Sequence, residues 1–169
     1  MLTDTRSGPD LLITGNLPDT LELRERLAAF VQEQSLSRVS VYQEDDKQLD
    51  IVAERETPLI SIGQAEVALP PGGFLQATQQ GQEALISLLE QALPKGEVVA
   101  DLFCGCGSFA LPAARLSKSV HGVEGNESLT NTLQKAANNK MLPVTTECRD
   151  LFRRPLLADE LTGFDTVII

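Results

Sequence analysis

The 169-residue chain is poor in the residues that bind metals, with one histidine and three cysteines. An iron–sulfur cluster needs about four cysteines. Cys104-Gly105-Cys106 is spaced too closely for a usual zinc pair, and Cys148 has no partner motif. We therefore predict no metal site. The thiols are interpreted as small buried groups in a reducing compartment, and the lone His121, inside a predicted strand, as structural.

Long apolar runs and positive charge are also scarce. No apolar run reaches eighteen residues and residues 1–6 show no signal-peptide pattern, so we expect a cytoplasmic protein without membrane contact. Lys and Arg number 14 against 24 Asp and Glu, which gives a net charge of −10. This charge opposes binding of a polyanion over the whole surface.

The most informative segment of the chain runs from residue 98 to residue 109. Val98-Val99-Ala100 is short, apolar and β-branched at its start, as in a buried parallel strand. Asp101 follows at its carboxyl end, where open α/β sheets bind ligands. Gly105 and Gly107 allow a sharp turn and close approach of the backbone to a ligand. With a helix predicted over 109–116, the pattern indicates a nucleotide-type cofactor loop.

The next elements complete such a site. Residues 119–124 predict a strand that ends in Glu124, 23 positions after the aspartate of the loop. A carboxylate there can accept both hydroxyl groups of a ribose. A helix is predicted over 126–139 and a third strand over 143–146. Asp150 follows that strand and is placed to accept from an exocyclic amino group such as that of adenine.

Two cofactor classes fit this pattern. Gly105-x-Gly107-x-x-Ala110 weakly satisfies the dinucleotide variant G-x-G-x-x-A. An acidic residue just before the loop instead suits S-adenosylmethionine, because its sulfonium and amino groups favour a nearby carboxylate, whereas a pyrophosphate would not. The residues therefore favour S-adenosylmethionine over a dinucleotide.

These motifs resemble the RNA (uracil-5-)-methyltransferase family. The resemblance rests on Asp-Leu-Phe-Cys-Gly-Cys-Gly-Ser-Phe at 101–109, Gly-Val-Glu-Gly at 122–125 and Phe-Leu-Gln at 74–76. It covers 72–169 well and 1–71 only loosely. Family members methylate carbon 5 of uridines in ribosomal or transfer RNA. The resemblance implies a Rossmann-like class I methyltransferase fold with S-adenosyl-L-methionine as cofactor.

The resemblance also implies roles for single residues. Cofactor contacts carry over to Gln76, Phe103, Glu124 and Asp150, while Ser108 occupies a position that is commonly Asn. Together with the residues of the loop, the predicted cofactor-binding set is Gln76, Asp101, Phe103, Gly105, Gly107, Ser108, Glu124 and Asp150.

Three of these residues have a structural alternative. Ser108 can cap the helix that follows the loop. Asp150 is of a type that forms turns, and Gln76 can be a polar residue at a helix entrance.

The family's chemistry needs three further parts. These are an Asp-Pro-Pro segment after the fourth strand, a cysteine nucleophile that adds to carbon 6 of uracil, and a glutamate base that removes the carbon-5 proton. By the resemblance, the strand predicted over 164–169 is the one that should lead into Asp-Pro-Pro. We therefore interpret the chain as a truncated fragment whose nucleophile and base lie beyond Ile169. As a fragment it is expected to be inactive and to bind RNA weakly or not at all.

Two other functions remain open from the residues alone. One is a methyltransferase that acts on an exocyclic amine or a protein side chain and needs no cysteine nucleophile. The other is a non-catalytic module that binds an adenosyl or nicotinamide group.

The predicted organisation is a small α+β domain over 1–71, followed over 72–169 by the amino-terminal part of the methyltransferase domain. A chain of this length can hold one core with a small appendage. Pro70-Pro71-Gly72-Gly73 marks the boundary.

Several elements are predicted around that boundary. A capping-box-like start at Asp19 opens a helix with an apolar stripe that includes Phe30 and Val31. Strands over 39–42 and 49–53 can pair, and 59–69 reads as a hairpin about Gly63-Gln64. A helix over 79–93 is expected to face the sheet with its leucines.

Overall fold

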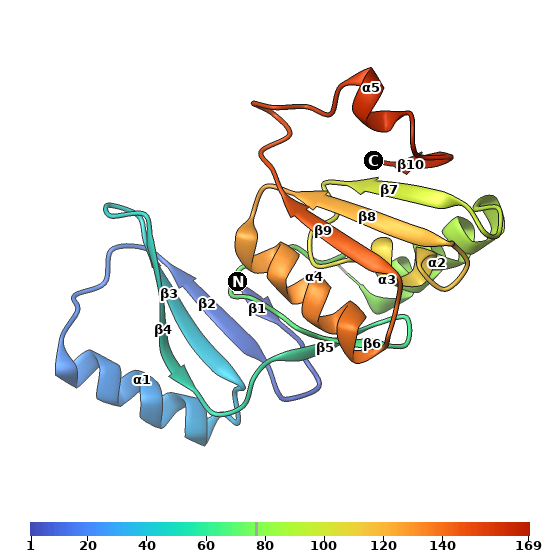
Figure 1. Ribbon diagram of the computed structural model, residues 1–169. Helices are drawn as coiled ribbons and strands as arrows, with labels where there is room; N and C mark the ends of the chain where they lie inside the picture. Colours follow the sequence, from blue (N-terminus) through green and yellow to red (C-terminus); the bar gives the residue numbers. More distant parts are fainter. Residues whose placement is uncertain (77) are drawn as a thin grey trace. The chain divides into compact units, whose positions relative to one another are not determined.

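A computed structural model describes residues 1–76 and 78–169, which form two compact units (Figure 1). Unit 1 comprises residues 1–60 and 68–72, and unit 2 comprises residues 61–67 and 73–169. The tip of the predicted hairpin thus groups with unit 2. The domain division at residues 71 and 72 stays a prediction.

Unit 1 is a four-stranded mixed sheet with one helix. The sheet has the order β1–β2–β3–β4, in which β2 and β3 are parallel and the outer pairs antiparallel. The helix connects the two parallel strands and covers a core of Val31, Leu36 and Val39. The elements are β1 (Leu2–Thr3), β2 (Asp10–Thr14), α1 (Leu21–Glu33), β3 (Arg38–Gln43) and β4 (Gln48–Glu54).

Helix α1 begins one residue later than the capping box predicted. Thr20 is the N-cap, and its hydroxyl oxygen accepts from Leu23 N–H at 3.3 Å. Asp19 instead accepts from Arg24 Nε at 2.6 Å. The prediction for Phe30 is also wrong, because this side chain is exposed while Val31 is buried.

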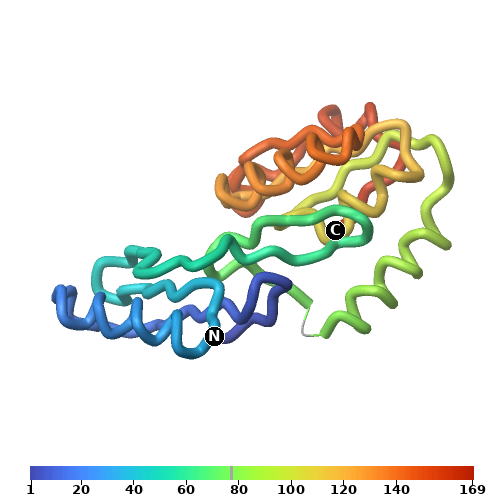
Figure 2. Tube along the Cα trace, turned by 90° about the horizontal axis from the view of Figure 1, so that it is seen from below, coloured from blue at the N-terminus to red at the C-terminus, as the bar shows by residue number. Residues whose placement is uncertain are grey.

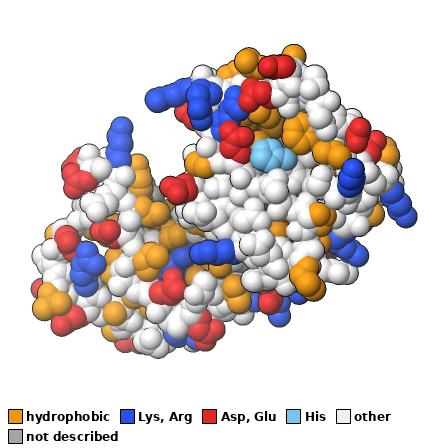
Figure 3. Space-filling model, in the orientation of Figure 1, with side chains coloured by type: hydrophobic (Ala, Val, Ile, Leu, Met, Phe, Trp, Pro, Cys, Tyr) orange, Lys and Arg blue, Asp and Glu red, His pale blue; other side chains and the backbone are white. Residues whose placement is uncertain are grey.

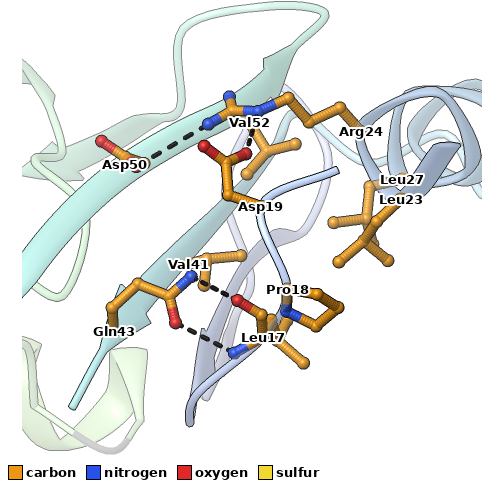
Figure 4. A pocket seen from close by; sticks show the side chains of 10 residues that line it. All are labelled: Leu17, Pro18, Asp19, Leu23, Arg24, Leu27, Val41, Gln43, Asp50 and Val52. Atoms are coloured by element: carbon orange, nitrogen blue, oxygen red, sulfur yellow. Dashed lines mark hydrogen bonds and ion pairs between the residues drawn. The ribbon is translucent and has the colours of Figure 1, made fainter. Parts of the chain in front are cut away.

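A small pocket lies in unit 1 between α1 and the sheet (Figure 4). The Gln43 amide donates to Leu17 O and accepts from Leu17 N–H, both at 2.9 Å, and so fixes the segment before α1. The pocket volume of about 20 Å³ is close to what one water needs. It is therefore a packing feature and not a ligand site.

A buried ion pair joins the two parallel strands of unit 1. Arg38 Nε and Nη2 donate to Asp10 Oδ1 and Oδ2 at 2.9 and 2.7 Å, and Nη2 also donates to Leu69 O. Asp10 and Arg38 face each other in the β2–β3 register, and both side chains are 4% exposed. The bidentate geometry satisfies charges that would be costly to bury alone.

Unit 2 contains a parallel sheet with the order β10–β7–β8–β9. The chain adds β8 and β9 outward from β7 and then returns to place β10 on the other side of β7. The strand order therefore reverses between β7 and β10, as in Rossmann-like sheets. Figures 1 and 2 show α4 running along one face of the sheet.

The bounds of the elements in this part of the chain are as follows. The hairpin strands are β5 (Leu59–Ile62) and β6 (Ala65–Ala68), and the sheet strands are β7 (Val98–Leu102), β8 (Ser119–Glu124), β9 (Val144–Cys148) and β10 (Thr166–Ile168). The helices are α2 (Gln79–Ala92), α3 (Ala110–Ala113), α4 (Glu127–Asn139) and α5 (Ala158–Leu161). No helix within residues 1–76 and 78–169 is both long and apolar enough to cross a membrane.

Two predicted helices differ from the structure. Every residue of α2 is at least partly exposed, and Leu88 is 61% exposed, so its leucines do not face the sheet as expected. Helix α3 spans four residues instead of 109–116. Beyond it the chain tightens into i→i+3 hydrogen bonds, from Arg115 N–H to Pro112 O and from Leu116 N–H to Ala113 O.

The Arg38–Asp10 pair leads to a stability prediction. Arg38→Met leaves the Asp10 carboxylate buried and unpaired, so the free energy of unfolding should fall by about 3–5 kcal/mol. The double variant Asp10→Leu/Arg38→Met should regain most of this loss. Urea unfolding monitored by circular dichroism measures both. Arg24→Met, which removes an exposed pair, is the control, and an equal loss in Arg24→Met and Arg38→Met would contradict the prediction.

Candidate cofactor-binding site

The ends of β7 and β8 bring the predicted site together. Leu102 pairs with Val123, so the loop after β7 and the last residue of β8 lie together at the carboxyl ends of the strands, which we call the carboxyl edge of the sheet. Cys104 N–H donates to Val123 O at 3.2 Å and continues this contact into the loop. Because both strands end beside the β7–β10 reversal, the site lies where open α/β sheets bind ligands.

Glu124 holds the loop with both oxygens of its carboxylate. Oε2 accepts from Gly105 N–H at 3.1 Å, and Oε1 accepts from Asn126 N–H at 3.0 Å. The Asn126 side chain in turn caps α4 by accepting from Ser128 N–H at 2.9 Å. Each carboxylate oxygen keeps acceptor capacity after one hydrogen bond, so Glu124 can still accept from a ligand.

Asp101 is a buried carboxylate with an unsatisfied oxygen. The residue is 1% exposed, and its Oδ2 has no hydrogen-bond partner in the described part of the chain. Burial raises the pKa of Asp101 to about 7, opposed only in part by a backbone hydrogen bond from Ala110. A buried oxygen without a partner is rare in proteins. It indicates that a donor or a cation completes the environment of Asp101.

The two loop glycines serve different purposes. Gly105 has φ +55°, and a Cβ built there meets no atom within 4 Å, so the space beside it is open. Gly107 has φ +99°, and a Cβ there would lie 2.5 Å from Leu133 Cδ1. Gly107 therefore lets α4 pack closely against the loop, and Gly105 is the position where the backbone faces free space.

An aromatic pair stands at the same edge of the sheet. Phe103 has φ +59°, a strained conformation for a bulky residue, and is 47% exposed. Its ring centroid lies 5.2 Å from that of Phe152, which is 88% exposed. The sequence reasoning missed Phe152. The available signal was an apolar aromatic residue two positions after Asp150.

Asp150 forms a turn, as its structural alternative predicted, and also lies at the site. Its Oδ1 accepts from Phe152 N–H at 3.0 Å and Arg153 N–H at 3.2 Å. The backbone places it beside the end of β8, since Arg149 N–H donates to Glu124 O at 2.9 Å. Its Oδ2 lies 3.4 Å from Arg153 Nε, and the side chain, which is 47% exposed, keeps acceptor capacity for a further group.

Arg149, which the sequence reasoning also missed, shapes the segment that carries Asp150 and Phe152. Its guanidinium donates to Glu160 at 2.5 and 3.0 Å, to Arg154 O at 2.7 Å and to Pro155 O at 2.9 Å. The hydrogen bond with Arg149 lowers the pKa of Glu160 to about 2. The bidentate pair holds the segment after β9 in one conformation.

Ser108 and Gln76 are not tied to the site by hydrogen bonds. Ser108 does not cap a helix, because the N-cap of α3 is Phe109, in a helical conformation without a side-chain bond. Among the described residues, Gln76 forms no hydrogen bond with the loop. Their cofactor roles stay predictions.

The buried cysteines and the histidine have structural environments. Burial raises the pKa of Cys106 to about 11 and that of Cys104 further, so both remain thiols at neutral pH. His121, pale blue in Figure 3, stacks on Phe164 at 6.0 Å, with Nδ1 2.9 Å from Thr145 Oγ1. The described residues hold no group of three or more metal-binding side chains.

The chain is similar in sequence to RNA methyltransferases. The chain is 40% identical to an uncharacterised RNA methyltransferase of Rhizobium meliloti over 98% of the chain and 39% of that protein. It is 29% identical to the 23S rRNA (uracil(1939)-C(5))-methyltransferase RlmD of Shewanella amazonensis, over 89% of the chain and 34% of that enzyme. No family model matches the sequence.

Among solved structures, the fold is similar to that of the Pyrococcus abyssi tRNA (uracil-54, C5)-methyltransferase in complex with S-adenosyl-L-homocysteine. The TM-score is 0.70 at 17% identity, over 99% of the chain and 42% of that enzyme. This likeness confirms the Rossmann-like class I methyltransferase fold. The chain spans about two fifths of the length of the Rhizobium meliloti relative. The resemblance predicted from the motifs is confirmed, since these similar proteins are named RNA methyltransferases and one of them is a uracil-C5 enzyme.

Proposed function

We propose that the protein transfers a methyl group from S-adenosylmethionine to carbon 5 of a uridine in ribosomal or transfer RNA, and that this chain holds the cofactor. The observation that carries the cofactor assignment is the unsatisfied Oδ2 of Asp101. It lies beside the loop whose Gly105 N–H donates to Glu124. The RlmD relative and the tRNA uracil-54 neighbour support carbon 5 as the target.

The residues at the edge of the sheet fit the parts of this cofactor. Glu124 can accept from the ribose hydroxyls, and Asp101 can accept from a positively charged amino group. The exposed rings of Phe103 and Phe152 offer apolar surface to the adenine, with Asp150 beside them as an acceptor for its amino group. When bound, S-adenosylmethionine supplies an electrophilic methyl group on a positively charged sulfur.

The charge of the site matches that chemistry. The carboxylates of Asp101, Glu124 and Asp150 create a negative potential that attracts a sulfonium and an ammonium group, whereas it would repel a pyrophosphate. This is the reason for preferring S-adenosylmethionine over a dinucleotide.

We assign no catalytic residue within this chain. Cys104 and Cys106 lie in the cofactor loop as buried thiols of raised pKa, which makes them poor nucleophiles. The chain's residues bind and orient the cofactor, and Arg149 positions the segment that carries Asp150 and Phe152.

The position of methylation can be tested with the protein expressed from its own gene. RNA transcribed with 5-³H-uridine is incubated with S-adenosylmethionine. Methylation of carbon 5 displaces the tritium into water in proportion to the methyl groups transferred. Methyl transfer without tritium release would overturn the carbon-5 assignment in favour of an amine target. Absence of both methyl transfer and tritium release would favour a non-catalytic binding module.

A first prediction concerns Glu124. Glu124→Gln should weaken binding of S-adenosylhomocysteine about 10- to 100-fold, because hydrogen bonds to a charged acceptor are lost. Isothermal titration calorimetry measures the affinity. Glu127→Gln makes the same charge change in the first turn of α4 and is the matched control. Equal affinities for the two variants would contradict the role of Glu124.

A second prediction concerns the pH dependence of binding. The pKa of Asp101 is raised to about 7 without ligand, and an ammonium group favours the carboxylate. Affinity for S-adenosylhomocysteine should therefore rise with pH up to about 7 and then level off, by at most about tenfold per pH unit. Asp101→Asn should remove this dependence. A pH-independent affinity of the unmodified chain between pH 5.5 and 8 would rule out the proposed contact.

The raised pKa of Asp101 also affects the stability of the chain without ligand. Stability should fall as the pH rises, whereas affinity for the ligand should increase. The folded state holds the Asp101 proton up to about pH 7, whereas the unfolded state loses it near pH 3.8. Stability should therefore decrease as pH rises between these values. Asp101→Asn should flatten this part of the profile in thermal unfolding measured by circular dichroism. An unchanged slope in Asp101→Asn would contradict the burial argument.

A further inference from the structure

Several lysines stand where the strands of the unit 2 sheet begin, at the end opposite the candidate cofactor site. Lys95 precedes β7, Lys118 directly precedes β8, and Lys140 precedes β9. Figure 3 shows several Lys and Arg side chains along the border of unit 2 where these strands begin in Figure 1. Acidic residues accompany them, because Glu97 directly precedes β7 and Asp165 directly precedes β10.

Backbone hydrogen bonds hold the turns of this edge together. Gly96 N–H donates to Leu116 O at 2.7 Å, Lys118 N–H donates to Glu97 O at 2.8 Å, and Val120 N–H donates to Pro143 O at 2.8 Å. The cations thus stand on segments fixed to one another and not on independent loops.

A pocket opens here next to Lys140 and a further cation, Arg115. Its volume is about 110 Å³, and it is lined by Ile62, Gln64, Ala65, Leu111, Arg115, Lys140 and Leu142. Within residues 1–76 and 78–169, the side chains of Arg115 and Lys140 have no ion pair or hydrogen bond. Both cations are therefore available to an anion, and the Gln64 amide adds a possible donor.

We propose that this pocket binds a backbone phosphate of the RNA substrate through Arg115 and Lys140. The proposal rests on the proposed function for the nature of the substrate. The pocket is smaller than the ~300–1,000 Å³ typical of sites for whole small molecules, so it suits one phosphate group and not a second cofactor. Two unpaired cations beside it supply the charge that a phosphate requires.

The position of the pocket defines which part of the RNA it contacts. Because the strands are about five residues long, their beginnings and their ends lie ~17 Å apart. The phosphate therefore belongs to a segment that flanks the target nucleotide. Such a contact positions the RNA without reading its sequence, and the negative net charge keeps it weak.

The test uses amide chemical shifts of the ¹⁵N-labelled chain at low salt. A single-stranded uridine-rich RNA octamer should shift the amides of 62–65, 111–115 and 140–142. Arg115→Gln/Lys140→Gln should weaken this binding at least tenfold and reduce the salt slope by about 0.7, the contribution of one phosphate contact for a single strand. Arg26→Gln/Lys47→Gln, which removes two cations from unit 1, is the matched control and should leave the shifts unchanged.

Each other result overturns the proposal. One such result is that the octamer shifts no amides, and another is that both double variants show equal shifts with it. A third is that inorganic phosphate, at the same phosphate concentration, shifts the amides as much as the octamer does, which would mark a site for free phosphate. Binding of S-adenosylhomocysteine should be unchanged in both double variants, which reports an intact fold. Because tritium release tests the proposed function separately, failure of the phosphate site is distinguishable from failure of the methyltransferase assignment.

Discussion

The site depends on one contact, in which the Glu124 carboxylate accepts from the Gly105 backbone amide at 3.1 Å. It joins the loop after β7 to the end of β8, and the second oxygen of the same carboxylate fixes Asn126, which caps α4. Close packing of Gly107 against Leu133 then sets the loop against that helix. Strand, loop and helix are therefore joined through Glu124, and its side chain keeps a defined orientation.

The parallel sheet of unit 2 carries different candidate sites at the two ends of its strands. The carboxylates of Asp101 and Glu124 lie near the ends of β7 and β8, and a pocket with Arg115 and Lys140 lies where the strands begin. The net charge of −10 describes neither group of residues. Under the proposed function, the first group would meet a cationic cofactor and the second a phosphate of the RNA.

The sequence predicted the parts of the site that depend on strand ends and failed where distant packing decides. Asp101 and Glu124 could be placed because parallel strands finish at one edge of a sheet. Phe152 and Arg149 could not, since their roles depend on how the segment after β9 folds back toward Phe103 and Glu160. Likewise, periodicity showed that α2 is amphipathic but not what its leucines contact. Residue type could not decide between Asp19 and Thr20 as the cap of α1, because both are good caps.

Strand β10 is an edge strand of the parallel sheet, and within the described residues it pairs only with β7. Its outer side carries a row of backbone donors and acceptors, and Val167 and Ile169 are exposed beside it. Such a border is a template for strand addition. Pairing of a further polypeptide segment with that edge would satisfy these backbone groups and cover the apolar side chains beside them.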